Sequence, residues 1–453
     1  MRDFQTRAYS AGLIATLGVL LAVLTGLVIG GGAAALQFSD PGPVIRFGVP
    51  LAKALMNLSM AVSIGSLVFA AFAANDKSAL LRKLLNLASA AAAVWAIAAS
   101  VHFVLSFVSV SGAEFSLEQS FSQGLWVYAT EIELGISLAL NLLAAFAISI
   151  LALSVSSLTA SAFVAALGLG SLIPLALIGH AAGTANHSLA VNSLGLHLVG
   201  IVTWVGGLVA VFALKKDLLG EARPMLSRYS SLALAGFVIV AVSGIGSSYV
   251  RIPDAAGLFS PYGQLLFIKV VLLVMLGGFG AIYRTRILSK ISEKGSFFKL
   301  ALLEIFIMGS AIGMGTALAR TAPPVSQGEF IVPSPAQLLT GEPLPPEFTM
   351  ATFFTQWKLD ILWGLIALWA IGAYLVAVRR LKARGDSWPV ARTISWVSGM
   401  LVLIFVTSGS LNVYQEYLFS IHMVAHMFLT MAIPVLLVPG APVTLLTLSL
   451  IHI

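Results

Sequence analysis

Residues 193–214 read SLGLHLVGIVTWVGGLVAVFAL and are followed directly by Lys215 and Lys216. The stretch contains no Asp, Glu, Lys or Arg. The hydrocarbon core of a bilayer is roughly 30 Å thick, and an α-helix needs about 20 apolar residues to cross it. The stretch therefore predicts a transmembrane helix with a basic boundary at its end.

The rest of the chain has the same character. Of its 453 residues, 59% are hydrophobic and 9% are charged, whereas a soluble globular chain carries about 25% charged residues. This composition excludes a soluble globular protein. The absence of cysteine excludes disulfides, thiolate metal sites and cysteine nucleophiles. A soft metal would have to be bound by Met sulfur and His nitrogen.

Similar apolar runs recur along the whole sequence. They predict an all-α, polytopic transmembrane helical bundle of about twelve spans. The predicted spans lie near residues 10–35, 47–73, 84–110, 126–152, 158–179, 193–214, 230–249, 263–283, 300–320, 358–378, 393–413 and 421–440. The first run exceeds the h-region of a signal peptide, so we interpret it as a signal anchor.

The basic residues predict the orientation. With a cytoplasmic N-terminus, all but six of the 25 Lys and Arg residues fall in cytoplasmic segments, as the positive-inside rule requires. The net charge of +7 then reflects topology and contact with lipid headgroups, and we exclude nucleic acid as a partner. The six exceptions are Arg46, Lys53, Arg251, Lys269, Arg320 and Lys358.

One long polar connection divides the chain. Residues 321–357 hold seven of the 18 prolines, a composition typical of a stiff, extended linker. We predict a membrane domain of about nine spans over residues 1–320, this outer linker, and a partial membrane domain of about three spans over residues 358–453.

Six of the seven histidines fall on one predicted side of the membrane. Polar groups within spans are costly and often functional. His180 lies at a predicted helix end, His187 in the following loop and His197 near the start of the next helix. These neighbouring segments can bring the three imidazoles together into a metal site. Imidazole alone does not choose among Cu, Zn, Fe and Ni, and a satisfied interhelical hydrogen bond is the alternative for each. The six are His102, His180, His187, His197, His422 and His426.

The segment His422-Met-Val-Ala-His426-Met427 points more sharply to copper. Its two His are four residues apart and share a helix face, while Met423, Met427 and Met431 form a second stripe turned about 100° around the helix. Nitrogen and thioether donors together favour Cu(I). Interhelical packing is the alternative.

Other polar residues suggest no enzyme. Lys53, Glu131 and Glu133 lie at similar predicted depth, which favours a buried structural pair over an ion relay. No phosphate-cradling loop, activated nucleophile or acid–base carboxylate pair is recognisable. We therefore expect no catalysis.

The first nine spans contain a set of recognisable motifs: Gly179-His180, His197 to Gly207, Pro261-Tyr-Gly-Gln-Leu-Leu, Lys269, and Leu-Ala-Arg320-Thr-Ala-Pro-Pro. With these motifs, the chain resembles the copper resistance D family of membrane proteins. The resemblance covers roughly residues 160–325 and more loosely the chain before them. It implies copper movement from the outer side toward the cytoplasm.

The remainder contains the motifs Trp357-Lys-Leu-Asp360, Arg384-Gly-Asp-Ser-Trp-Pro389, His422 to Met427, and Pro439-Gly-Ala-Pro-Val-Thr. With these motifs, it is similar to membrane copper-delivery factors that help to assemble cytochrome c oxidase. The resemblance places metal on His422 and His426, supported by the adjacent Met residues. That family's domain ordinarily continues for several more spans, so we expect a fragment of a longer reading frame.

Together the two resemblances look like the fused form found in actinobacteria. They imply a multi-pass protein of the bacterial plasma membrane that takes up copper and delivers it for oxidase assembly. The implied partners are copper ions, membrane lipid, an extracytoplasmic copper chaperone and cytochrome c oxidase subunits. Two rival interpretations remain: a b-type cytochrome with His-ligated haem, and an assembly scaffold without metal.

Overall fold

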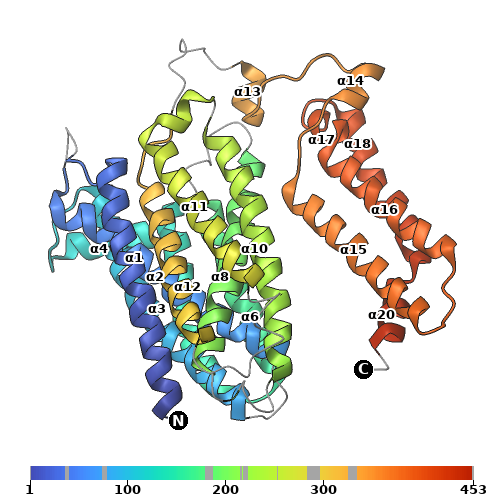
Figure 1. Ribbon diagram of the computed structural model, residues 1–453. Helices are drawn as coiled ribbons and strands as arrows, with labels where there is room; N and C mark the ends of the chain where they lie inside the picture. The colour runs from blue at the N-terminus through green and yellow to red at the C-terminus, as the bar shows by residue number, and fades with distance from the viewer. Residues whose placement is uncertain are drawn as a thin grey trace. The chain divides into compact units, whose positions relative to one another are not determined.

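Figure 1 shows the protein as a computed structural model. It describes residues 2–35, 40–73, 79–178, 187–214, 217, 223–252, 254–282, 296–324 and 334–450. Contacts divide the chain into two compact units. Unit 1 comprises Met1–His180 and Leu194–Gln327, and unit 2 comprises Ala181–Ser193 and Gly328–Ile453.

Unit 1 is a bundle of long helices. The long helices run up and down through the bundle. One end, which we call the upper end, is where α1, α3 and α10 end and where α2 and α11 begin (Figure 1). The helices are α1 (Arg2–Gly30), α2 (Gly42–Ala73), α3 (Ala79–Ser111), α4 (Gln119–Glu131), α5 (Glu133–Ser154), α6 (Leu158–Gly170), α7 (Leu172–Leu177), α8 (His187–Ala213), α10 (Arg223–Arg251), η1 (Ala256–Phe259), α11 (Pro261–Ile282) and α12 (Ser296–Leu318).

The predicted fold class is confirmed. Twelve helices are long and apolar enough to cross a membrane, nine before the Pro-rich segment and three after it, and the described part of the chain contains no strand. A helix satisfies its own backbone hydrogen bonds, which lipid cannot do. The cytoplasmic location of the N-terminus stays a prediction.

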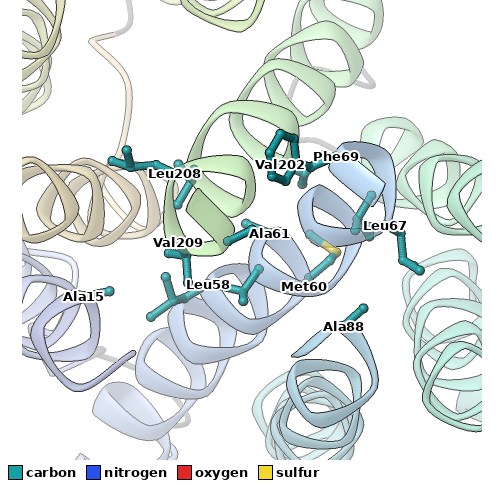
Figure 2. Packing of buried hydrophobic residues seen from close by; sticks show 14 of the residues in the cluster. Ala15, Leu58, Met60, Ala61, Leu67, Phe69, Ala88, Val202, Leu208 and Val209 are labelled. Carbon is teal, nitrogen blue, oxygen red and sulfur yellow. The ribbon is translucent and has the colours of Figure 1, made fainter. Parts of the chain in front are cut away.

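Glycines let the central helices of unit 1 touch backbone to backbone. A Cβ on Gly65 of α2 would overlap the carbonyl oxygen of Val202 on α8, and one on Gly206 would overlap that of Ala61. Figure 2 shows Ala61 between the two helices. Small residues at such crossings are the usual packing device in membranes, where the hydrophobic effect does not drive helices together.

Polar groups in this core satisfy one another across helices. Trp95 of α3 donates from Nε1 to Asn141 Oδ1 on α5 at 2.9 Å, and the Asn141 amide lies 3.7 Å from the sulfur of Met60 on α2. The Ser63 hydroxyl donates to the carbonyl of Ala88 on α3 at 2.9 Å. These bonds fix the rotation of the helices because an unpaired polar group in the core would be costly.

The fourth predicted span begins later than expected. We predicted it from residue 126, but the helix breaks at Ile132 and only α5 spans. The separate helix α4 folds back so closely that a Cβ on Gly135 would overlap the carbonyl oxygen of Tyr128. Glu131 and Glu133 flank the break and are exposed, which explains why the apolar helix does not continue through them.

Unit 2 contains three spans, of which the last is interrupted. Tyr374 of the first span donates to the carbonyl of Gly440 at 2.8 Å and stacks on Trp396 of the second. The elements are α13 (Pro335–Thr340), α14 (Met350–Thr355), α15 (Ile361–Ala383), α16 (Val390–Ser408), α17 (Ser410–Tyr414), α18 (Phe419–Met427), the π-helical turn η3 (Phe428–Ala432), α19 (Ile433–Leu437), η4 (Val438–Gly440) and α20 (Pro442–Leu450).

Residues 334–357 differ from the extended linker that we predicted. They form α13 and α14 and pack on unit 2. Tyr414 donates to the carbonyl of Pro346 at 2.9 Å, and the Lys358 ammonium lies 3.6 Å from carboxylate oxygens of both Glu342 and Glu416. Proline has no backbone N–H, so carbonyls in this segment have fewer backbone donors nearby. Here a tyrosine hydroxyl is the donor instead. The domain boundaries themselves stay a prediction.

The α2–α8 crossing gives a stability prediction. In the variant Gly65→Ala, the new methyl group meets backbone that cannot move away without separating the helices. We expect the free energy of unfolding to fall by about 1–3 kcal/mol, measured by thermal or denaturant unfolding of the purified protein in detergent.

The matched control is Gly278→Ala on α11, where an added Cβ meets nothing within 4 Å. Alanine is a better helix former than glycine by about 1 kcal/mol, so this variant should be as stable as the natural protein or more so. Equal destabilisation by both substitutions would contradict the proposed close crossing.

Candidate functional site

His197 lies at the centre of a hydrogen-bonded chain between three helices of unit 1. It is buried on α8. Its Nδ1 is 3.0 Å from the hydroxyl of Ser243 on α10, and its Nε2 is 3.2 Å from the ammonium of Lys269 on α11. Ser243 in turn donates to the carbonyl of Ile239 at 2.5 Å.

The donors and acceptors fix the tautomer of His197. A lysine ammonium carries only donors, so Nε2 accepts and the proton lies on Nδ1, which donates to Ser243. Both ring nitrogens are thus engaged within the protein. A metal ion can bind Nε2 only by displacing Lys269. We predicted His197 as a metal ligand; its hydrogen-bond partners could not be inferred from local sequence because they lie 46 and 72 residues away.

His102 is buried on α3, where its Nδ1 lies 3.4 Å from the hydroxyl of Ser106. It also hydrogen-bonds the backbone of Val49 on α2 and lies within electrostatic range of Lys53. Lys53 makes no ion pair with Glu131 or Glu133, which are exposed. Our prediction of a buried pair among these three residues is therefore wrong, because the break at Ile132 directs both carboxylates outward.

The predicted convergence of His180, His187 and His197 stays a prediction. His180 lies outside the described residues. His187, expected in a loop, is the first residue of α8 and is exposed. Among the residues that the structure describes, no three His, Asp or Glu side chains come together in a way that could hold a metal ion.

The methionines of the last span line an apolar groove in unit 2. The groove has a volume of about 560 Å³ and is lined without any charged side chain. Met423 is 41% exposed and Met427 is 48% exposed. The full lining is Met423, Val424, Met427, Phe428, Met431, Ala432 and Val435.

The π-helical turn places Met431 in the same groove. A π-turn winds less per residue than an α-helix, so Met431 returns to the side of Met423 and Met427 instead of drifting around the axis. The turn ends at Ala432, two residues before Pro434, which has no backbone N–H to donate. The sequence suggested the Met stripe but gave no signal for the π-turn or for the groove.

The two histidines of the motif lie outside the groove lining. His422 and His426 are exposed on α18, and the ring of His422 stacks on Phe419 with centroids 6.5 Å apart. The predicted separation of a His face from a Met face is therefore present.

Three family models match separate parts of the chain. The copper resistance protein D-like N-terminal domain matches residues 44–190, copper resistance protein D matches residues 223–318, and the cytochrome c oxidase caa3 assembly factor matches residues 372–452. One chain thus matches copper-resistance D models over residues 44–190 and 223–318 and an oxidase assembly factor model over residues 372–452. The predicted fusion is thus confirmed, and the matches indicate a membrane role in copper resistance or oxidase assembly.

The matches place the candidate residues in these regions. Ser243 and Lys269 lie within the copper resistance protein D match, whereas His197 lies between the two copper-resistance matches. The whole His-Met motif of α18 falls within the assembly-factor match.

The similar curated proteins are mycobacterial and uncharacterized. One from Mycobacterium leprae is 41% identical over 105 residues, which cover 23% of this chain and 16% of the relative. One from Mycobacterium bovis and one from Mycobacterium tuberculosis are each 37% identical over 143 residues, 29% of this chain and 22% of the relative. The chain therefore spans less than a quarter of the length of these relatives. No solved structure matches the chain.

The hydrogen bonds of His197 predict that two serines of α10 contribute unequally to stability. Ser243→Ala removes the acceptor of the Nδ1 proton and leaves a buried donor unpaired, so we expect the free energy of unfolding to fall by about 1–2 kcal/mol. Ser248→Ala removes only a bond to the carbonyl of Gly244 on the same helix and should change it by less than about 0.5 kcal/mol. Denaturant unfolding in detergent measures both, and similar losses would argue against a structural link through His197.

Proposed function

We propose that this protein is a non-catalytic integral membrane protein that handles copper. Copper is its cargo: unit 2 takes up Cu(I) on the α18 face and supplies it during assembly of a terminal oxidase, and unit 1 serves copper uptake. The family matches support the copper and oxidase context. The observation that carries the proposal is the thioether-lined groove on α18 and η3.

The chemistry of the groove favours a soft, singly charged cation. Thioether sulfur is a neutral, polarizable donor that selects Cu(I) over harder ions. Met423, Met427 and Met431 present three such donors along one groove, with no lysine, arginine or carboxylate in its lining. A harder dication would find no charged oxygen ligand there.

The adjacent histidines extend the set of donors. His422 and His426 are exposed beside the Met face, and exposed neutral imidazole can pass copper to or from a partner. We propose that they form the entry to the groove. In this scheme the partners are an extracytoplasmic copper chaperone on one side and cytochrome c oxidase subunits on the other.

Anaerobic Cu(I) titration against a chromogenic competitor tests the proposal. The purified full chain should bind Cu(I) saturably, with a stoichiometry of about one on unit 2. The triple variant Met423→Leu/Met427→Leu/Met431→Leu keeps the side-chain volume but removes the donors, and should lower the affinity at least about tenfold, equivalent to about 1.4 kcal/mol.

Met350→Leu serves as the matched control because Met350 is exposed at the start of α14, outside the groove. It should bind Cu(I) as the natural protein does. An unchanged affinity in the triple variant would refute the Met groove as the copper site. His422→Ala/His426→Ala should slow copper transfer to a competitor more than it weakens binding.

Spectroscopy distinguishes the rival functions. A b-type cytochrome would show a Soret band in the purified protein, and the copper proposal predicts a preparation without one. A metal-free scaffold would contain no copper by elemental analysis even after loading. Either of these results would overturn the proposal.

A further inference from the structure

The upper end of unit 1 carries cationic side chains without acidic partners. Lys53, Arg251, Lys269 and Arg320 come from α2, α10, α11 and the residues after α12. In the described ranges, no carboxylate lies within ion-pair distance of any of the four. Elsewhere the chain pairs its partly buried cations, as Lys83 does with Asp217 at 2.7 Å. None of these four cations is neutralised by a direct ion pair, although Asp40 and Asp254 lie at the same end of the bundle and Asp40 pairs with Arg46.

The position of the Lys269 ammonium is the best defined of these. His197 accepts one of its three N–H bonds at 3.2 Å, and Ser243 in turn holds the ring of His197. On the other side lies Gly315 of α12, whose missing side chain leaves room; a Cβ there would stand 3.5 Å from the ammonium. Lys269 thus projects into the space between α8, α11 and α12 with two donors to spare.

Arg251 lies near both Lys269 and Tyr262 at the upper end of unit 1. Arg251 ends α10 and lies within electrostatic range of Lys269, His197 and Tyr262. One of its N–H groups donates to the carbonyl of Ser247 at 3.0 Å, which leaves the rest of the guanidinium fork available. Tyr262 is 6% exposed, and its hydroxyl makes no hydrogen bond to any described residue.

The cluster therefore offers donors and positive charge but almost no acceptors. The acceptor nitrogen of His197 is already occupied by Lys269. Two like charges in a low-dielectric site destabilise each other, and an anion between them removes that cost. N–H and O–H donors of this kind match the oxygens of a carboxylate or phosphate. A free metal cation would meet repulsion there.

We propose that Lys269, Arg251 and Tyr262 form a binding site for an oxyanion, a carboxylate or a phosphate, at the upper end of unit 1. His197 and Ser243 act as positioning residues that aim the Lys269 ammonium. The site is distinct from the Met groove of unit 2 and does not depend on copper binding there.

The test measures anion binding by the full chain in an uncharged detergent and a phosphate-free, low-salt buffer. Phosphate and citrate are titrated by calorimetry and by their effect on the melting temperature. We expect saturable binding of at least one of them and a rise in melting temperature with its concentration. Lys269→Gln and Arg251→Gln should each weaken binding at least tenfold.

Three further variants separate a binding role from a structural one. Arg82→Gln removes a positive charge from the start of α3, where Arg82 contacts the carbonyl of Leu153, and should leave anion affinity unchanged. Lys269→Arg keeps the charge and should retain affinity within about fivefold. Tyr262→Phe removes only a donor and should weaken binding less than Lys269→Gln does.

The melting temperature of Lys269→Gln without anion is a further test. Glutamine can still donate to His197, so Lys269→Gln keeps the positioning bond while it removes repulsion from Arg251. Its melting temperature should therefore equal or exceed that of the natural protein without anion, and should no longer rise when anion is added. A lower melting temperature that still rises with anion would overturn the proposal.

Nanodiscs identify the source of the oxyanion. If phosphatidylglycerol, but not phosphatidylcholine, competes with phosphate, the site binds a lipid headgroup; if neither lipid competes, it binds a free anion. Absence of saturable binding for phosphate, citrate and phosphatidylglycerol refutes the site. An equal loss of binding in Arg82→Gln and Lys269→Gln refutes its location.

Discussion

The low-dielectric surroundings of the helices control this protein from its backbone to its functional groups. Without water, a buried polar atom that lacks a partner inside the chain is costly. Trp95, Asn141 and Met60 do so across three helices, and His197 does so across three others. The same constraint applies at the upper end of unit 1. Cations that make no ion pair with a carboxylate are costly there and call for another partner.

The two units meet this constraint with different chemistry. Unit 1 gathers donors and positive charge around Lys269, whereas the groove of unit 2 is lined by thioethers and hydrocarbon. An anion suits the first site and a soft cation suits the second. If both proposals hold, one chain combines two binding chemistries that would interfere with each other in a single site; Lys269 and the Met groove fall in different family matches.

Hydropathy and motifs predicted the fold class and the fusion, because span length and the residues around His197 and His422 are local features of the sequence. The contacts between distant segments were not predictable in this way. The break at Ile132 and the π-turn at Phe428–Ala432 depend on packing that no local pattern reports. Lys269 was recognised from the sequence as one of six basic residues outside the predicted cytoplasmic segments. Its bond to His197 was not predictable, because the two residues are 72 positions apart. The Pro-rich segment was misjudged because composition does not reveal the tyrosines that hold it.

The pairing of the first helix with the last helix of unit 1 has a consequence for biosynthesis. A Cβ on Gly309 of α12 would overlap the carbonyl oxygen of Ala15 on α1, so the two backbones touch. At roughly 5–20 residues per second, a ribosome needs at least about 15 s to travel from one residue to the other. During that time the small-residue face of α1 waits in the bilayer without its native neighbour. Nascent chains of this protein therefore pass through a stage in which that face of α1 lacks the helix that covers it in the folded protein.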